Sequence, residues 1–468
     1  MKLIVAGYNI DSSLIAQLED QNATPEVISA AYARISRSQK SVDDLRKEAL
    51  EEIEKARHSN ENIIFEMGHS SIAEHAVYNL DIIGVSRLLT DTIQRSRLAS
   101  FTEKSQRYVT FGKDYIVPEE LKDHPQLKKR YNELANKLFK EYERSYQLLD
   151  KLYQKKRPDL KVRDRQSMAK EDARYILPMA TKTQMGMTIN ARSLENLLRR
   201  LAKSNLLEAH ELHNLIMDNV APISPSLLRY TEDDGYNGQI NLNLINECCF
   251  LQQELPFITS LAPLEIVKAM TQSEPIDDII LAALVYEQSE MDWGQNIVEI
   301  SELPASTKNI LWEQVFAGMK SWHKVPRAFE LADMTFEIHM SECCWAQFKR
   351  HRQCTMFRKS QSEDMIIPCA IRSIGRVSAW DKLYIETQKY INELPEELSH
   401  IGNYLRLNGS PLTVLVKMNM REVYHFVRLR ADEHAQWEIQ NIAKLMVKIA
   451  KKMAPKTSSK LCGKSDFK

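Results

Sequence analysis

The chain contains one sequence pattern twice, and this internal repeat limits its possible folds more than any other feature. SRLLTDTIQRSRLASFTEKSQRY begins at Ser86, and SECCWAQFKRHRQCTMFRKSQSE begins at Ser341. Alignment of their Arg-x-Arg triplets at an offset of 255 residues needs no gap and also aligns Ser105 with Ser360. A repeat of this length indicates two copies of one folding unit within the 468 residues.

A second block repeats at a different spacing. TINARSLENLLRRLAKSN contains Asn190, and VKMNMREVYHFVRLRADEH contains Asn419, 229 residues later, so the second copy lacks about 26 residues between its blocks. In the first copy the extra residues fall in the charged stretch LKKRYNELANKLFKEYERSYQLLDKLYQKKR, whose periodicity predicts a helix. Because Glu residues interleave with its Lys residues, we interpret it as a solvated helical arm rather than as a nucleic-acid-binding surface.

The repeat predicts a first domain at residues 1–250 and a second at residues 251–468. The boundary falls near residues 245–262, where apolar segments are interrupted by Pro256 and, just beyond, Pro263. Strands and helices are mixed without regular βαβ alternation, which favours the α+β class.

Local patterns predict several elements. In each copy a segment of alternating apolar residues, 77–83 and 334–340, leads into a short helix with the arginine triplet at its helix-to-loop transition. Residues 434–453 have apolar residues at helical spacing. The N-terminal MKLIVAGYNIDSS lacks the long apolar region and cleavage site of a signal peptide, so it predicts a first β-strand.

Composition excludes several classes of protein. Lys plus Arg (63) balances Asp plus Glu (63), so no net charge favours nucleic acid or an anionic membrane. No apolar run reaches the roughly 18 residues of a membrane span. The seven cysteines form no CxxC pair and no zinc spacing, which is typical of reduced thiols. We therefore expect a cytoplasmic protein with neither a nucleic-acid nor a membrane partner.

The arginine triplets are the first candidate ligand groups. Paired guanidinium groups suit anionic phosphates through bidentate hydrogen bonds. A single Arg-x-Arg is more often a surface salt-bridge cluster, but its repeated context favours a functional role. The chain has no GxGxxG or Walker loop, so arginines from dispersed segments would have to hold any dinucleotide.

The segment GHSSIAEH places His69 and His75 six residues apart, on different sides of a helix, so we predict no metal site there. A histidine that packs against a ligand ring or caps a loop is the more plausible interpretation.

These segments resemble flavin-dependent thymidylate synthases. GHSSIAEH, QRSRLASFTEKSQRY, ARYILP and NARSLENLL follow that family's motif order in the first copy. The second copy contains the family's signature, in which Arg350, His351 and Arg352 are followed by Ser360, and NMREVYHFVRLRADEHAQWEIQ is similar to its C-terminal helix motif. The resemblance implies two tandem copies, each a mainly antiparallel sheet packed with long helices.

The resemblance also implies an activity. Family members make dTMP from dUMP, with methylenetetrahydrofolate as carbon donor, bound FAD, and NADPH as reductant. An arginine helps to ionise N3 of the uracil, and no cysteine takes part. The family's homotetramers share sites between subunits, so a fused chain is expected to form an equivalent homodimer.

The resemblance assigns roles to individual residues. Those expected to bind dUMP are Glu103, Lys104, Ser105, Gln106, Arg107, Arg174, Gln347, Arg350 and Arg430, of which Arg430 is the catalytic arginine at N3. Those expected to bind FAD are His69, Ser71, Arg95, Asn190, Arg192, Asn196, Arg350, His351, Arg352, Asn419, Arg421 and His425. In the second copy the GHxS segment is reduced to WHKVPRAFE, so flavin is less expected there.

The two copies depart from the family in complementary ways. The first keeps residues 103–107 but has Ser96 for the triplet histidine and Leu201 for the N3 arginine. The second keeps the triplet and Arg430. In this copy, however, Arg358 replaces the Glu of the nucleotide loop, Ser362 replaces its Arg, and Asn403 stands where the first copy has Arg174. We expect composite sites formed by unlike copies. Arg358 would be an unpaired charge in a nucleotide-base pocket unless that pocket is abandoned or reused.

Alternatives remain open at this point. Both copies could be decaying and the protein inactive. The chain could be a related flavoenzyme for another pyrimidine nucleotide or one-carbon acceptor. A non-catalytic nucleotide-binding or scaffold protein is a third reading.

Overall fold

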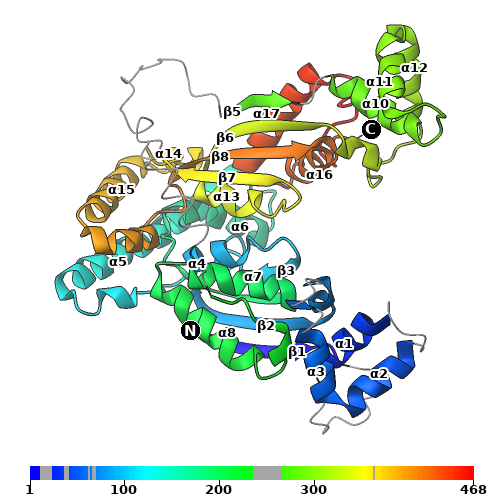
Figure 1. Cartoon of the computed structure of the whole chain (residues 1–468). Coiled ribbons are helices and arrows are strands. Elements are labelled where there is room, and N and C mark those ends of the chain that lie inside the picture. The colour runs from blue at the N-terminus through cyan, green and yellow to red at the C-terminus, as the bar shows by residue number, and fades with distance from the viewer. Residues whose placement is uncertain are drawn as a thin grey trace. The chain divides into compact units, whose positions relative to one another are not determined.

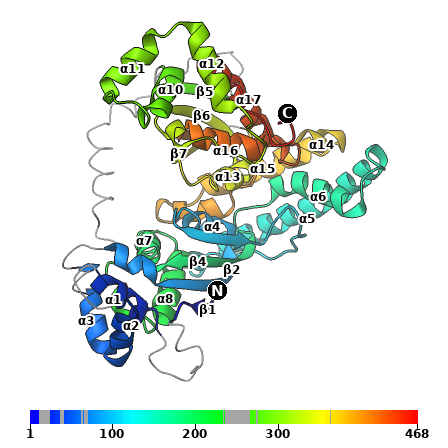
Figure 2. The same cartoon turned by 90° about the vertical axis from the view of Figure 1, so that its right-hand side faces the viewer.

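The computed structural model describes residues 1–10, 24–35, 42–61, 64–65, 70–232, 235, 266–272, 275–361 and 364–467. These residues belong to two compact units, drawn in Figures 1 and 2. The first unit comprises Met1–Ser260 and Cys369–Leu407, and the second comprises Leu261–Pro368 and Asn408–Lys468. A segment that follows the second triplet in sequence therefore packs with the first unit. The predicted boundary at residues 245–262 lies outside the described residues.

Each unit is built on a four-stranded antiparallel sheet. The strands of the first are β1 (Lys2–Tyr8), β2 (Val77–Ser86), β3 (Ala99–Glu103) and β4 (Lys182–Asn190), and those of the second are β5 (Val267–Gln272), β6 (Asp333–Ser341), β7 (Thr355–Ser360) and β8 (Pro411–Asn419). The strand orders are β1-β2-β4-β3 and β5-β6-β8-β7. Equal orders in two antiparallel sheets confirm the predicted α+β class and the tandem duplication.

Strand pairing also repeats at both ends of the central strands, although β2 has a register shift between Ile83 and Val85 that β6 lacks. Val77 lies opposite Asn190 in the first sheet, and Asp333 lies opposite Asn419 in the second. Along β4 every second side chain is buried, which is the period of two expected when one face of a sheet covers a core. The first β-strand predicted from the N-terminal sequence is confirmed as β1.

Some helices of each unit pack on its sheet, and others pack mainly on neighbouring helices. The first unit contains α1 (Glu26–Ile35), α2 (Val42–Glu51), α3 (Ile53–Glu61), α4 (Arg87–Ile93), α5 (Pro125–Lys156), α6 (Val162–Ala173), α7 (Ala191–Ala202), α8 (Leu207–Val220), α14 (Cys369–Ser373) and α15 (Val377–Asn392). The second unit contains α10 (Ile276–Tyr286), α11 (Trp293–Glu302), α12 (Ala305–Phe316), α13 (Glu342–Phe348), α16 (Met420–Arg430) and α17 (Trp437–Met453). Short 3-10 helices include η3 (Ser70–His75), η5 (Arg174–Ile176), η6 (Pro225–Leu227), η8 (Arg327–Glu330) and η9 (Glu396–Tyr404). The amphipathic helix predicted at residues 434–453 is confirmed as α17.

The helix after the central strand begins in the same way in both units. The Ser86 hydroxyl accepts a hydrogen bond from the Leu89 amide and donates one to Glu208 at 2.6 Å. The Ser341 hydroxyl caps α13 equivalently and donates to Glu438 at 2.6 Å. A serine N-cap satisfies an amide that the first helical turn leaves unpaired.

Asn190 and Asn419 cap the following helices. Their side-chain oxygens accept hydrogen bonds from the backbone amides of Ser193 and Glu422, at 2.8 and 2.9 Å. Both asparagines have extended backbone, as N-cap residues usually do, and they start α7 and α16 at aligned positions.

The charged stretch before α6 is a helix, as predicted, but it is not a solvated arm. α5 buries Tyr131, Leu138 and Tyr142 along one face. It lies beside α15 in Figure 1, where the indole of Trp380 donates to Ser145 at 3.0 Å. Periodicity gave the helix correctly, whereas the partner helix comes from a segment more than 200 residues away in sequence.

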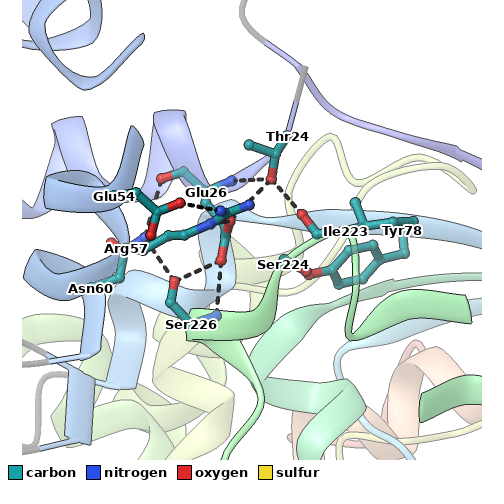
Figure 3. Close-up of polar contacts among 9 residues, drawn as sticks. All are labelled: Thr24, Glu26, Glu54, Arg57, Asn60, Tyr78, Ile223, Ser224 and Ser226. Carbon is teal, nitrogen blue, oxygen red and sulfur yellow. Dashed lines mark hydrogen bonds and ion pairs between the residues drawn. The ribbon is translucent and has the colours of Figure 1, made fainter. Parts of the chain in front are cut away.

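A buried carboxylate joins α1 to the rest of the first unit (Figure 3). Glu26 is fully buried and accepts hydrogen bonds from the Ser226 amide and hydroxyl at 2.9 and 2.7 Å. Arg57 of α3 donates to the same carboxylate at 2.9 Å. Because the charge is fully hydrogen-bonded, its burial ties α1 and α3 to η6 without leaving an unpaired ion.

None of the helices within the described ranges is long and apolar enough to cross a lipid bilayer.

Candidate functional site

The arginine triplet of the second copy lies in the turn that follows α13. This helix ends at Phe348, so Arg350, His351 and Arg352 lie beyond its last turn, at the predicted helix-to-loop transition. Arg350 is exposed, Arg352 is half-buried and His351 is buried. The turn therefore combines two accessible guanidinium groups with one imidazole in the core.

His351 connects two charged groups. Arg430 Nε donates to His351 Nε2 at 3.0 Å, and Glu422 Oε1 lies 3.3 Å from His351 Nδ1. Because Nε2 accepts a hydrogen bond, the ring proton belongs on Nδ1, toward the carboxylate. Burial lowers the pKa of His351, which favours this neutral ring. Arg430 also donates to the Gln347 carbonyl at 3.3 Å, so its guanidinium is held at two points.

The same imidazole belongs to a group of metal-ligand types. Ligand atoms of His351, Glu422 and His425 lie within 4.8 Å of one another. In the tautomer that Arg430 selects, however, Nε2 accepts a hydrogen bond and Nδ1 carries the proton, so His351 has no free nitrogen for a metal. This geometry favours a chain of contacts from Arg430 through His351 to Glu422.

The first copy holds an arginine at its triplet by a different route. Ser96 replaces the histidine, and its hydroxyl accepts a hydrogen bond from Arg200. Arg200 precedes Leu201, which aligns with Arg430 and is completely buried in the core. Burial, together with the charge of Arg95, lowers the pKa of Arg200 to about 10. The first copy therefore has no arginine at the N3 position but has one a residue earlier.

The loop expected to bind the nucleotide follows β3. Glu103 pairs with Arg87 at 3.2 Å and accepts a hydrogen bond from Gln94 at 2.8 Å. Arg107 forms an ion pair with Glu171 of α6 at 2.5 Å. The carboxylates of Glu103 and Glu171 thus pair with two guanidinium groups that an anionic ligand could otherwise contact.

The remaining loop residues are held locally. Lys104 lies over the Phe111 ring at 4.9 Å, and the Ser105 hydroxyl accepts from the Arg107 amide at 3.2 Å. Gln106 is buried, as is Arg174, which starts η5 directly after α6. Because Arg174 follows Glu171 by three residues, it lies on the same side of the helix end as the partner of Arg107. Within the first unit, these two arginines expected to bind dUMP are therefore associated with the same helix end.

The ion pair at Glu103 is reversed in the second copy. Arg358, which aligns with Glu103, lies 2.5 Å from Glu342, which aligns with Arg87. Glu342 is 2% exposed, and the Arg358 guanidinium also lies 5.5 Å from the centre of the Trp345 ring. Arg358 is therefore not an unpaired charge, because its partner changed sign together with it.

Six of the residues expected to bind flavin line a cavity, three in each unit, whereas the triplet at residues 350–352 does not line the cavity of the second unit. Arg95, Arg192 and Asn196 line a cavity of about 590 Å³ in the first unit. Asn419, Arg421 and His425 line one of about 670 Å³ in the second. Each cavity contains an equivalent ion pair, Arg192 with Glu74 at 2.5 Å and Arg421 with Glu330 at 2.6 Å.

Other expected residues contribute less to these cavities. Ser71 is exposed on η3, and the side chain of Asn190 serves as a helix cap. His69 and Ser362 lie outside the described residues. The motifs did not indicate Arg87, Arg200 or Glu422. These three residues contact Glu103, Ser96 and His351, which belong to the motifs.

Comparisons with known proteins agree with this architecture. The family described as thymidylate synthase complementing protein matches residues 17–226 and 266–456. The chain therefore belongs to this family and contains its domain twice.

Individual relatives match either one copy or nearly the whole chain. A flavin-dependent thymidylate synthase of Clostridium tetani is 30% identical over 225 residues, which is 47% of this chain and 88% of that protein. One of Sulfolobus acidocaldarius is 32% identical over 224 residues, or 47% of this chain and 77% of that protein. UPF0159 protein Ta1429 of Thermoplasma acidophilum is 24% identical over 437 residues, or 84% of this chain and 86% of that protein. The last protein is thus similar in its double length.

Proposed function

We propose that the chain is a flavin-dependent thymidylate synthase that methylates dUMP to dTMP. In this proposal methylenetetrahydrofolate donates the carbon, FAD is the bound cofactor and NADPH is the reductant. The chain acts as a homodimer, and each working site combines residues of unlike copies. The names of the single-length relatives support the activity, and the complementary losses of the two copies support the composite site.

The observation that carries the proposal is the fixed position of Arg430. Its guanidinium is bound by the neutral ring of His351 and by the Gln347 carbonyl. A positive charge held beside a uracil stabilises the anion left when N3 loses its proton. Arg430 stays protonated at every physiological pH, so this contribution needs no titrating side chain and no cysteine.

Arg107 and Arg174 supply the phosphate-binding part of the proposal. Guanidinium groups bind phosphate through paired, charge-assisted hydrogen bonds. Arg107 is paired with Glu171, so dUMP binding would exchange this carboxylate for the nucleotide phosphate. Glu171 then acts as a resting partner that keeps Arg107 oriented.

The residues present fit a flavin. Both cavities fall within the volume range of cofactor sites, and each is lined by a half-buried or exposed arginine at the start of a capped helix. The flavin's diphosphate and polar edges would be bound by Arg95, Arg192 and Asn196 in one cavity, or by Arg421 and His425 in the other. The triplet of the second copy would also contact the flavin. Bound flavin supplies the hydride that completes the methyl group.

The test uses the purified full chain, reconstituted with FAD, and 5-tritiated dUMP. With methylenetetrahydrofolate and NADPH we expect yellow protein and release of tritium, and no comparable turnover of dCMP or UMP. Colourless protein that cannot be reconstituted with FAD would contradict the proposal. Turnover confined to another nucleotide would replace the substrate while keeping the enzyme class.

A further inference from the structure

Glu422 stands where the first copy has Ser193. Both residues occupy the third position of their helices, α16 and α7, and their backbone amides donate to the capping side chains of Asn419 and Asn190. The cap uses only the backbone of this position, so the side chain can differ without loss of the helix start. The second copy therefore carries a carboxylate that the shared scaffold does not require.

The surroundings of this carboxylate do little to balance its charge. Glu422 is 7% exposed. Across the described ranges no lysine or arginine nitrogen lies within 4.0 Å of it, and its one charged-group contact is His351 Nδ1 at 3.3 Å. A buried carboxylate without a cation costs stability, so a general stabilising ion pair does not account for Glu422.

The ring proton of His351 has two possible positions. A neutral imidazole has one N–H and one acceptor nitrogen, and Arg430 Nε donates to Nε2 at 3.0 Å. A proton on Nε2 would place two N–H donors face to face. The rings of Phe426 and His425 lie 4.8 and 5.6 Å from the imidazole, and Glu422 adds beside Nδ1 a carboxylate, which only accepts hydrogen bonds. This carboxylate therefore selects the tautomer with the proton on Nδ1.

We propose that Glu422 is a positioning residue for Arg430. By keeping the proton of His351 on Nδ1, it makes Nε2 an acceptor that orients the guanidinium together with the Gln347 carbonyl. The effect of this orientation on turnover rests on the proposed function, in which Arg430 acts at N3 of the uracil. The position of the ring proton does not rest on it.

The arrangement predicts a loss of turnover in acid. A protonated imidazole donates from both nitrogens, so it no longer accepts from Arg430. Burial lowers the pKa of His351, and Glu422 opposes this shift, whereas Arg430 and His425, which also face the ring, add to it. Removal of the Glu422 charge should therefore lower the pKa of His351 further and move the acid limb of the turnover profile to lower pH.

The experiment measures dUMP turnover by the purified full chain as a function of pH, in the wild type and in variants of Glu422. Glu422→Ser copies the first copy and removes the acceptor, so it should lower kcat about 10- to 100-fold because Arg430 is no longer oriented. Glu422→Gln keeps an acceptor, so kcat should stay within about threefold of the wild type while the acid limb moves to lower pH. When Arg430→Ala is already present, Glu422→Ser should cause no further loss, because the two residues act as a unit.

Glu433→Ser is the matched control, because it removes an exposed carboxylate close to Arg430 in sequence. It should leave kcat within about twofold. The tautomer is measured separately by heteronuclear NMR of protein with isotope-labelled histidine, and His351→Gln assigns the signal. We expect the proton on Nδ1 in the wild type and its loss from that nitrogen in Glu422→Ser.

A ring proton on Nε2 in the wild type, a normal kcat in Glu422→Ser, or a further loss in the double variant would overturn the proposal. If the wild type does not turn over dUMP, the proposed function fails. The positioning role then stands on the loss of the Nδ1 proton in Glu422→Ser, and it is overturned if that proton is unchanged.

Discussion

Ser86 and Ser341 begin equivalent helices with closely similar hydrogen bonds, whereas the ion pairs just beyond these caps have opposite polarity. Arg87 pairs with Glu103 in the first copy, and Glu342 pairs with Arg358 in the second. The caps satisfy backbone groups, so a change there costs stability in either copy. The two residues of each ion pair balance only each other's charge, so two compensating substitutions can reverse the polarity of the pair.

The same division holds around the triplets. His351 and Arg430 interact in the second copy, and Ser96 and Arg200 interact in the first. Each copy retains an arginine beside its triplet, but only the second holds it with a ring whose proton is directed to a carboxylate. The scaffold is therefore shared, and the charged groups on it have diverged in pairs.

Breaking the reversed ion pair should give the largest effect on stability. Arg358→Glu places a second carboxylate beside buried Glu342 and should lower the free energy of unfolding by about 3–5 kcal/mol. The double variant Glu342→Arg with Arg358→Glu copies the polarity of the first copy and should recover most of that loss. Urea denaturation of the three proteins measures both effects.

Lys359→Glu is the control for the reversed pair, because it makes the same charge change at the adjacent exposed position. It should change stability by less than about 0.5 kcal/mol. If the double variant is no more stable than Arg358→Glu alone, the two residues do not form an exchangeable pair.

Substitutions at Arg430 and at the aligned Leu201 should have different effects: the first should reduce activity, and the second should reduce stability. Arg430→Ala should reduce turnover of dUMP by roughly 10²- to 10³-fold, because a charge aimed at the reacting base is lost, and should leave flavin binding mostly intact. Leu201→Ala changes the aligned residue of the first copy, whose buried side chain contributes about 2–5 kcal/mol to stability. Its folded fraction should turn over normally. Equal losses of turnover in the two variants would contradict the assignment.

Arg107→Ala should weaken dUMP binding by about 1.5–3 kcal/mol, as when a hydrogen bond to a charged group is removed. Equilibrium titration with dUMP measures the change. Arg163→Ala removes the same charge from an exposed position on α6 and should leave the affinity nearly unchanged. An equal loss in both variants would indicate a general electrostatic effect instead of a phosphate contact.

The smallest effect concerns pH. Burial lowers the pKa of His351 in the folded protein, so the unfolded chain binds more protons as pH falls below 6.5. The contribution of the neutral ring to stability is complete above pH 6.5 and is lost toward the lower, folded-state pKa. The slope is at most about 1.4 kcal/mol per pH unit. His351→Gln, which keeps an acceptor for Arg430, should flatten the stability profile between pH 6.5 and 5; an unchanged profile would contradict the neutral ring.

Sequence patterns predicted the repeated scaffold well because short-range features determine it. The aligned serines and asparagines became N-caps, and period-two segments became the central strands. The packing of α5 was missed because its partner, α15, comes from a distant segment whose sequence gives no indication of that contact. Only half of the reversed ion pair could be recognised from sequence. Glu103 and Arg358 align with each other, but their partners, Arg87 and Glu342, lie sixteen residues earlier and become neighbours only in the folded chain.

The candidate site was predicted unevenly for a related reason. Motif matches indicated Arg430 and His351, which the structure brings together. They did not indicate Glu422, whose role depends on the tautomer of a neighbouring ring. They also missed Arg200, because the first copy supplies its arginine one residue earlier than the alignment expects.

The most direct test of the central claim is the number of dUMP molecules bound by each flavin-reconstituted chain. Composite sites built from the nucleotide loop of the first copy and Arg430 of the second predict one dUMP per chain, with binding weakened by Arg107→Ala. Two equivalent sites per chain would mean that each copy is complete by itself. No binding at all would mean that the complementary losses left no working site.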